Sequence, residues 1–187
     1  EEVEGHEQAG RVEKYAEALR AELADRAPSG ESLFETIFVG GGTPTVLPAD
    51  LLVDLVHDLA FGLQEGGEFT VEANPGTIDA ALLTRLADSG ATRLSLGVQS
   101  FAGSLRRALG RQVSDGEIDA ALEAIGAVGW REWNLDLVFG IPGQSWQDAT
   151  ADLARTVQAG PTHISLYDLT YTPAYARQVD DTSGSAA

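Results

Sequence analysis

The chain of 187 residues contains no cysteine and no methionine. Without cysteine it can form no disulfide and can offer no thiolate to a metal ion. The three histidines, His6, His57 and His163, are too scattered in the sequence to predict a metal triad, so we expect no metal ligands in this chain. No apolar run approaches the roughly 18–20 residues that cross a bilayer, and no transmembrane segment is predicted.

Positive charge is also scarce. The chain has 12 lysine and arginine residues against 29 acidic residues, which gives a net charge of −17. A surface this negative repels the phosphates of nucleic acids, so a general nucleic-acid-binding role is not expected. The 43% of hydrophobic residues is ordinary for a soluble globular domain, and we expect a cytoplasmic protein.

Short β-type runs alternate with segments of helical periodicity. The runs lie near 35–40, 69–73, 92–99, 133–139 and 163–169. Helices are predicted over 8–25, 48–63, 78–89, 102–109, 115–128 and 146–159. Because strands that alternate with helices form parallel sheets with crossover connections, the pattern predicts an α/β fold.

The two faces of the predicted strands differ in character. In "RLSLGVQ" (93–99) the apolar side chains share one face, and small or polar ones share the other; "WNLDLVF" and "HISLY" are similar. An open doubly wound sheet would be apolar on both faces, and a closed barrel fills its interior with branched residues. We therefore predict a partial, open (β/α) barrel over residues 1–179 with a large ligand in its polar interior, followed by a polar tail at 180–187.

A glycine-rich stretch, "IFVGGGTPTVL" (37–47), follows the first predicted strand. It lies at the carboxyl end of that strand, where barrel enzymes place their sites. Consecutive glycines allow a ligand to approach the backbone closely. The alternative is a tight turn with no role in binding.

Polar side chains stand at the ends of the next strands. Glu72, Gln99 and Asp136 are predicted to point inward, with Tyr167 at the end of the last strand. Carboxylates in a barrel interior need polar partners, which either a bound ligand or a structural hydrogen-bond network could supply. Arg111 either reaches back over the barrel mouth or is an ordinary surface arginine.

Six motifs occur in order along the chain. They are "GGGTPT", "VEANPGT", "RLSLGVQSF", "ALGRQ", "NLDLVFGIPGQSWQD" and "GPTHISLYDLT". From about residue 12 to residue 173 the sequence resembles radical S-adenosylmethionine proteins of the oxygen-independent coproporphyrinogen III oxidase family, particularly the haem-chaperone branch. The resemblance implies a partial (β/α)6 barrel that binds S-adenosylmethionine across its strand ends.

The resemblance also implies the residues that bind this cofactor. They match Gly40, Gly41, Gly42, Thr43, Glu72, Gln99, Arg111 and Asp136. In the family the glycine stretch contacts the amino group of the methionine moiety. The matches imply that Arg111 meets the methionine carboxylate and that Asp136 meets the ribose or adenine.

The family also uses a [4Fe–4S] cluster held by a CxxxCxxC motif, which this sequence lacks. Together with the missing initiator methionine, this predicts a fragment or the core of a longer protein. Such a chain would lack the first barrel strand, the cluster-binding segment and the carboxyl-terminal domain. The alternative is a cysteine-free pseudoenzyme.

The resemblance leaves three possible functions: a porphyrinogen oxidase, a haem chaperone or an inert structural core. The implied partners are porphyrinogen or haem, with an electron donor for the intact protein.

Overall fold

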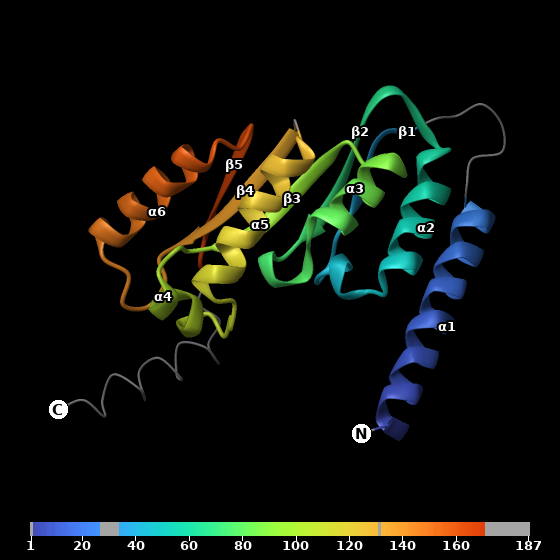
Figure 1. The fold of residues 1–187 in the computed structure, drawn as a ribbon, viewed down its shortest axis with the longest axis horizontal. Helices are drawn as coiled ribbons and strands as arrows, with labels where there is room; N and C mark the ends of the chain where they lie inside the picture. The colour runs from blue at the N-terminus through green and yellow to red at the C-terminus, as the bar shows by residue number, and fades with distance from the viewer. Residues whose placement is uncertain (1, 27–33, 131, 171–187) are drawn as a thin grey trace.

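The computed structural model describes residues 2–26, 34–130 and 132–170. Five strands and six α-helices alternate in it (Figure 1). The strands are β1 (Phe34–Val39), β2 (Leu63–Ala73), β3 (Arg93–Gln99), β4 (Glu132–Phe139) and β5 (His163–Asp168). The helices are α1 (Glu2–Arg26), α2 (Ala49–Ala60), α3 (Ala80–Asp88), α4 (Gly103–Ala108), α5 (Asp115–Val128) and α6 (Trp146–Ala159).

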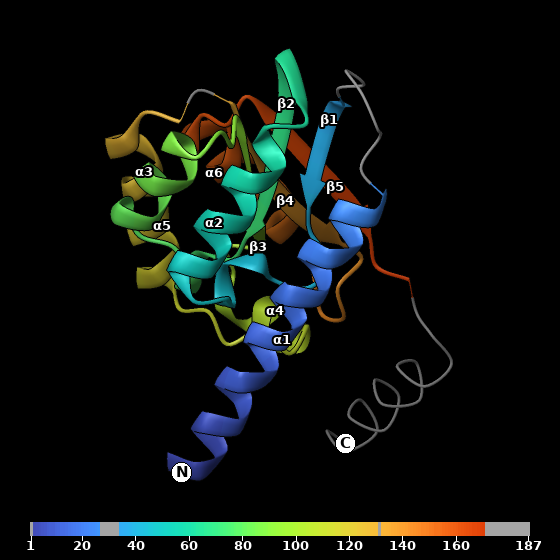
Figure 2. The same ribbon diagram turned by 90° about the vertical axis from the view of Figure 1, so that its right-hand side faces the viewer.

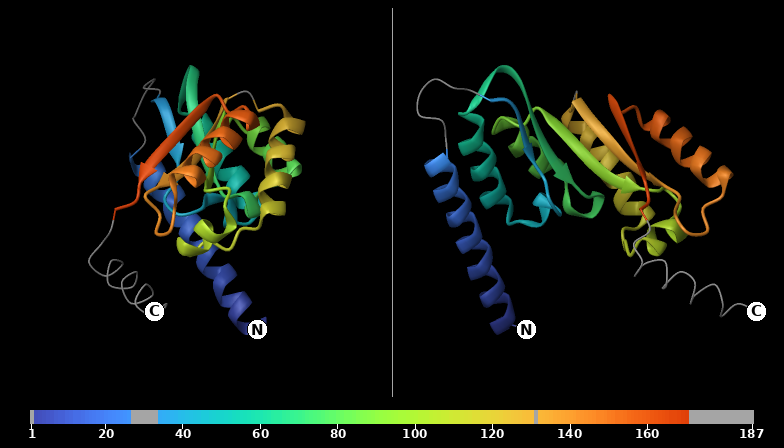
Figure 3. Two further views of the ribbon diagram at one scale, coloured as in Figure 1. Left: turned by 90° about the vertical axis from the view of Figure 1, so that its left-hand side faces the viewer. Right: turned by 180° about the vertical axis from the view of Figure 1, so that it is seen from behind.

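The strands form one sheet in the order β1-β2-β3-β4-β5, and all four neighbouring pairs are parallel. The sheet is curled, and the helices α2, α3, α5 and α6 cover its outer face (Figure 1). Seen from behind, the concave face carries no helix among the described elements (Figure 3). The predicted partial, open (β/α) barrel is confirmed.

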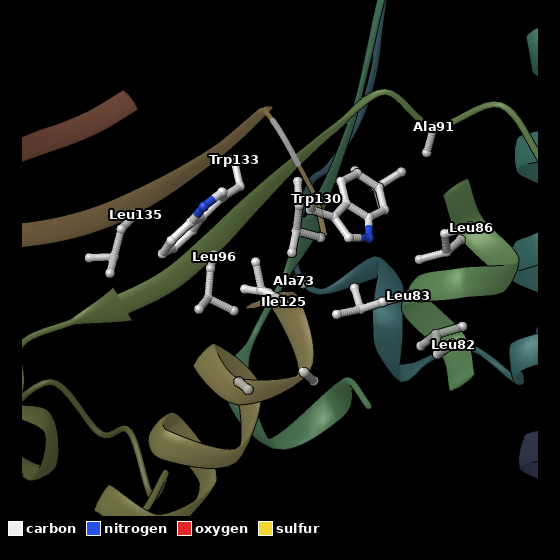
Figure 4. Close-up of a cluster of buried hydrophobic side chains, with 14 of the residues drawn as sticks. Ala73, Leu82, Leu83, Leu86, Ala91, Leu96, Ile125, Trp130, Trp133 and Leu135 are labelled. Atoms are coloured by element: carbon white, nitrogen blue, oxygen red, sulfur yellow. The ribbon is translucent and has the colours of Figure 1, made fainter. Parts of the chain in front are cut away.

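The hydrophobic core lies between the sheet and the outer helices. Leu94, Leu96 and Leu135 point outward from β3 and β4 and are fully buried. Figure 4 shows Leu96 and Leu135 close to Ile125 of α5, with Trp133 beside them. Since each strand turns alternate residues to opposite faces, burial of these leucines places the polar residues between them on the concave face.

Three predicted boundaries differ from the structure by three residues or more. The helix expected over 8–25 begins at Glu2. The helix expected over 48–63 ends at Ala60, and β2 begins at Leu63, six residues before the predicted start at Phe69. The added stretch, "LQEGGE", pairs with β1 from Phe34 onward, although the register shifts near that end. Its polar and glycine residues gave no alternating hydrophobic signal, because only pairing with the neighbouring strand stabilises it.

The first helix, α1, lies beside α2 at the β1 edge of the sheet (Figure 2). The guanidinium Nε of Arg20 donates to the carboxylate of Asp58, 3.1 Å away on α2. A cavity of about 540 Å³ with mostly apolar walls lies between α1, β1 and α2 and reaches Gly40 and Gly41.

The polar tail predicted at 180–187 lies outside the described residues.

Two helices begin with reciprocal caps. The hydroxyl and backbone N–H of Ser114 donate to Glu117, and those of Ser145 donate to Asp148 in the same way. These bonds favour the ionised carboxylates and hold the pKa of Glu117 and the pKa of Asp148 below their ordinary values. Hydrogen bonding and charge from Arg106 lower the pKa of Asp115.

The chain is expected to lose stability as the pH falls below about 4.5. All three carboxyl groups have a lower pKa in the folded than in the unfolded state, so their contribution is complete above the unfolded pKa values and disappears as the pH drops through the folded ones. Melting temperatures recorded from pH 7 to pH 3 test this. Ser114→Ala should reduce the acid dependence, because it removes the hydroxyl that caps with Glu117; an identical acid profile in that variant would contradict this source.

Candidate functional site

The centre of the concave face is a hydrogen-bonded polar network across three strands. Asn134 of β4 is 2% exposed, and its Nδ2 donates to Ser95 Oγ on β3 at 2.8 Å and to Asp136 Oδ1 at 2.6 Å. Its Oδ1 accepts from the hydroxyl of Ser165 on β5 at 3.0 Å. The hydroxyl of Ser95 also donates to Asp136 Oδ2 at 3.2 Å. Asp136 is therefore held from two sides by neutral donors and remains partly exposed on this face.

The glycine stretch follows β1 and packs against Glu72 at the end of β2. The backbone N–H of Gly41 donates to Glu72 Oε2 at 3.1 Å. A Cβ on Gly40 would lie 2.6 Å from the same oxygen and 2.5 Å from the ring of Phe38, so any other residue would displace one or both of these side chains. Gly41 and Gly42 have φ values of +94° and +115°, and a Cβ on either would meet nothing within 4 Å. The turn thus needs glycine for its shape and opens into unfilled space.

Asn74, directly after β2, links two of the predicted residues. Its Nδ2 donates to the hydroxyl of Thr43 at 2.7 Å, and its Oδ1 accepts a long bond from Arg111 Nη1 at 3.4 Å. Arg111 comes from the loop after α4 and does reach back to the mouth of the barrel, although it is exposed. The site thus has a carboxylate near the glycine turn and a guanidinium close by.

Gln99 ends β3 and folds back over Gly97. A Cβ on Gly97 would lie 2.8 Å from Gln99 Nε2 and 3.0 Å from Asn74 Oδ1, so the two side-chain amides lie next to each other there. Gln99 therefore lies at the same carboxyl-terminal edge of the sheet as Glu72 and Arg111. The predicted site residues form a row along this edge, from the glycine turn past Asn74 to Gln99, and Asp136 lies on β4 further along the sheet.

Asn74 and Asn134 were not among the site residues predicted from the sequence, and neither were Ser95 and Ser165 of the same network. Asn74 falls inside the "VEANPGT" motif, and strand alternation put Asn134 on the inner face. An amide carries no charge whose burial demands explanation. The partners of Asn74 come from two loops, and those of Asn134 come mainly from the two neighbouring strands. Tyr167, near the end of β5, is 54% exposed.

The donor atoms of this chain do not fit an iron–sulfur cluster. Cysteine is absent from the sequence, and no group of three or more His, Asp or Glu side chains within residues 2–26, 34–130 and 132–170 could hold a metal ion. S-Adenosylmethionine does suit the exposed row, because a carboxylate, a guanidinium and accessible glycine backbone complement its amino and carboxylate groups.

None of the helices in the described segments is both long and apolar enough to cross a membrane.

This fold is that of a radical S-adenosylmethionine protein. The family model of the Radical SAM superfamily matches residues 7–154, and the chain belongs to that family. It is 39% identical to the haem chaperone HemW of Synechocystis over 166 residues, which are 88% of this chain and 40% of that protein. It is 34% identical over 172 residues to the oxygen-independent coproporphyrinogen III oxidase of Paracoccus denitrificans, covering 89% of this chain and 38% of that protein.

A solved structure agrees with these relationships. The coproporphyrinogen III oxidase HemN of Escherichia coli, described as a radical SAM enzyme, superimposes with a TM-score of 0.81 at 29% identity. The match covers 94% of this chain and 42% of that structure. The resemblance inferred from the six motifs is thereby confirmed. The chain spans about two fifths of the length of these relatives.

Proposed function

We propose that this chain is the barrel core of a radical S-adenosylmethionine, [4Fe–4S]-dependent protein of porphyrin or haem metabolism, similar to the oxygen-independent coproporphyrinogen III oxidases. The observation that carries the proposal is the row of Glu72, Arg111 and Gln99 beside the glycine turn at the carboxyl-terminal edge of the half-barrel, with Asp136 near it on the concave face. The intact protein would act in the cytoplasm with a separate electron donor. The cluster supplies the electron for radical formation, and its ligands are not in this chain.

Each part of the cofactor has a place in the proposed site. The Glu72 carboxylate keeps acceptor capacity beyond the Gly41 N–H, so it can receive the amino group of the methionine moiety beside the glycine turn. The guanidinium of Arg111 can pair with the methionine carboxylate. Asp136, held by Ser95 and Asn134, can accept hydrogen bonds from the ribose or adenine.

S-Adenosylmethionine is expected to bind this chain only weakly, because cluster iron would normally hold its amino and carboxylate groups. The compound should be titrated into the isotope-labelled chain while amide NMR shifts are followed. We expect shifts at Gly41, Gln99 and Asp136. Adenosine, which lacks the methionine group, should shift Asp136 but leave Gly41 unchanged. Tight binding by calorimetry, or shifts confined to another surface, would contradict the assignment.

Gly41→Val, introduced into the intact cluster-bearing protein, is expected to lower the rate of S-adenosylmethionine cleavage by about 100-fold or more. The valine side chain would enter the open space before the turn, and a β-branched residue is strained at a φ of +94°. Formation of 5′-deoxyadenosine measures the rate. Gly126→Val is the control, since Gly126 lies on outer helix α5 and a Cβ there also meets nothing. Unchanged cleavage by Gly41→Val would remove the glycine turn from the site.

A haem chaperone is the second candidate. Identities of 39% and 38% to the haem chaperones of Synechocystis and Escherichia coli, against 34% to the Paracoccus oxidase, favour it. The intact protein should be given coproporphyrinogen III with reductant and, separately, haem. Conversion of propionate to vinyl groups supports the oxidase; a stoichiometric shift of the haem Soret band without decarboxylation supports the chaperone. Failure in both assays would leave the inert structural core.

A further inference from the structure

The backbone at Gln99 has an unusual conformation. Its φ of +68° is the only positive value at a non-glycine position in the described part of the chain. The N–H of Ser100 donates to the carbonyl of Val98 at 2.8 Å, which closes a three-residue γ-turn around Gln99. A γ-turn with positive φ is rare and strained. The pairing register with β4 also shifts between Gly97 and Gln99, so the turn lies where β3 leaves the sheet.

This turn determines where the Gln99 side chain goes. Residues 94–98 alternate regularly between the two faces, and the positive φ breaks that alternation at the strand end. The side chain consequently folds back until its Nε2 lies over Gly97, next to Asn74 Oδ1. In an ordinary extended conformation the chain would leave the strand in a different direction, and the amide would not reach this position.

Asp152 of α6 holds the residues immediately after the turn. Its Oδ2 accepts from the hydroxyl of Ser100 at 2.7 Å, and its Oδ1 accepts from the backbone N–H of Phe101 at 2.7 Å. Asp152 is 4% exposed and Ser100 is completely buried. Both carboxylate oxygens thus fix two successive residues from a helix about 50 positions later in the chain.

Ser100 is fixed from other directions as well. Its carbonyl accepts from Arg106 Nη1 at 2.9 Å, and its hydroxyl accepts from the N–H of Ala102 at 3.1 Å. A strained residue persists only where its surroundings over-determine its conformation. Asp152 is the member of this arrangement that comes from a separate outer helix, so it can restrain the turn independently of the local chain.

We propose that Asp152 is a positioning residue, which locks the strained turn and so holds the Gln99 amide over Gly97 at the mouth of the barrel. The importance of that position rests on the proposed function, in which Gln99 belongs to the cofactor site. The restraint of the Gln99 turn by Asp152 is a property of the chain alone. It can therefore be tested without S-adenosylmethionine, and failure of the chain to bind the cofactor would leave the lock intact.

The first test is the position of the Gln99 side chain in Asp152→Ala. In the wild-type chain we expect a nuclear Overhauser effect between the Gln99 side-chain amide protons and the α protons of Gly97. This effect should be lost in Asp152→Ala. Thr156→Val is the matched control: Thr156 is completely buried one turn later on α6, and its hydroxyl donates only to the Asp152 backbone carbonyl. The control should retain the effect even where its stability falls. Retention in Asp152→Ala would overturn the proposal.

The second test measures the strain by thermal unfolding. Gln99→Gly should melt about 2–4 °C above Gln64→Gly, because glycine relieves the turn, whereas Gln64 is exposed on β2 with an ordinary negative φ. In an Asp152→Ala background, where the turn has relaxed, this advantage should vanish. An equal difference in melting temperature in both backgrounds would contradict the restraint of the turn by Asp152.

If Asp152→Ala does not fold, Ser100→Ala replaces it in both tests, because it removes one contact with Asp152. The same results would then support or contradict the proposal.

Discussion

Arg106→Ala is expected to lower the free energy of unfolding by about 3–5 kcal/mol. Arg106 is 2% exposed, and its guanidinium donates to the backbone carbonyls of Val113 and Ser100, at 2.9 Å each. Alanine leaves both carbonyls without this donor and opens a cavity. The ion pair with Asp115 adds little, because that carboxylate is 67% exposed.

Urea denaturation of the two chains measures this loss. Arg107→Ala is the matched control, since Arg107 is the next residue of α4 and is exposed. It should change the free energy of unfolding by no more than about 0.5 kcal/mol. Equal effects of the two substitutions would show that burial of the Arg106 guanidinium contributes nothing specific.

Asn134→Ala is expected to lower the free energy of unfolding by about 2–4 kcal/mol. Asn134 makes three hydrogen bonds, of which two join β4 to β3 and β5 and the third holds Asp136; its loss leaves Asp136 with the single bond from Ser95. Chemical denaturation gives the stability, and NMR shifts of the Asp136 carboxyl group report the change at the site. Ser165→Ala removes one bond of the same network and should cost less than half as much. Similar losses in both variants would contradict a central role for Asn134.

The order and type of the main elements could be predicted from the sequence because each has a local cause. Ser114 with Glu117 starts α5 through a capping box, and Gly129 ends it with a φ of +75°. Outward leucines of β3 and β4 identified the inner face, because alternation is a property of any extended strand. The early start of β2 at Leu63 was missed, since its polar residues become a strand only by pairing with β1.

The candidate site was predictable where a residue type demanded an explanation. Three glycines in succession, an inward Glu72 and an inward Asp136 all conflict with an ordinary apolar core. The glycines and Glu72 lie in the row at the edge of the sheet, and Asp136 lies on the concave face beside it. Asn74 was missed because its role depends on Thr43 and Arg111, which come from two other loops. No pattern within a single strand could reveal a contact of that kind.

The sequence by itself determined the alternating α/β order, the polar concave face and the glycine turn, because caps, periodicity and backbone freedom act over a few residues. Only the tertiary structure decided how Asp152 meets Ser100, how Arg106 is buried and how the Gln99 backbone is bent. Asp152 reaches Ser100 because α6 packs beside the end of β3, and Arg106 is buried because the chain on both sides of α4 folds around its guanidinium. The strain at Gln99 is the clearest case, because a glutamine gives no local indication of a positive φ, and its neighbours in space must impose it.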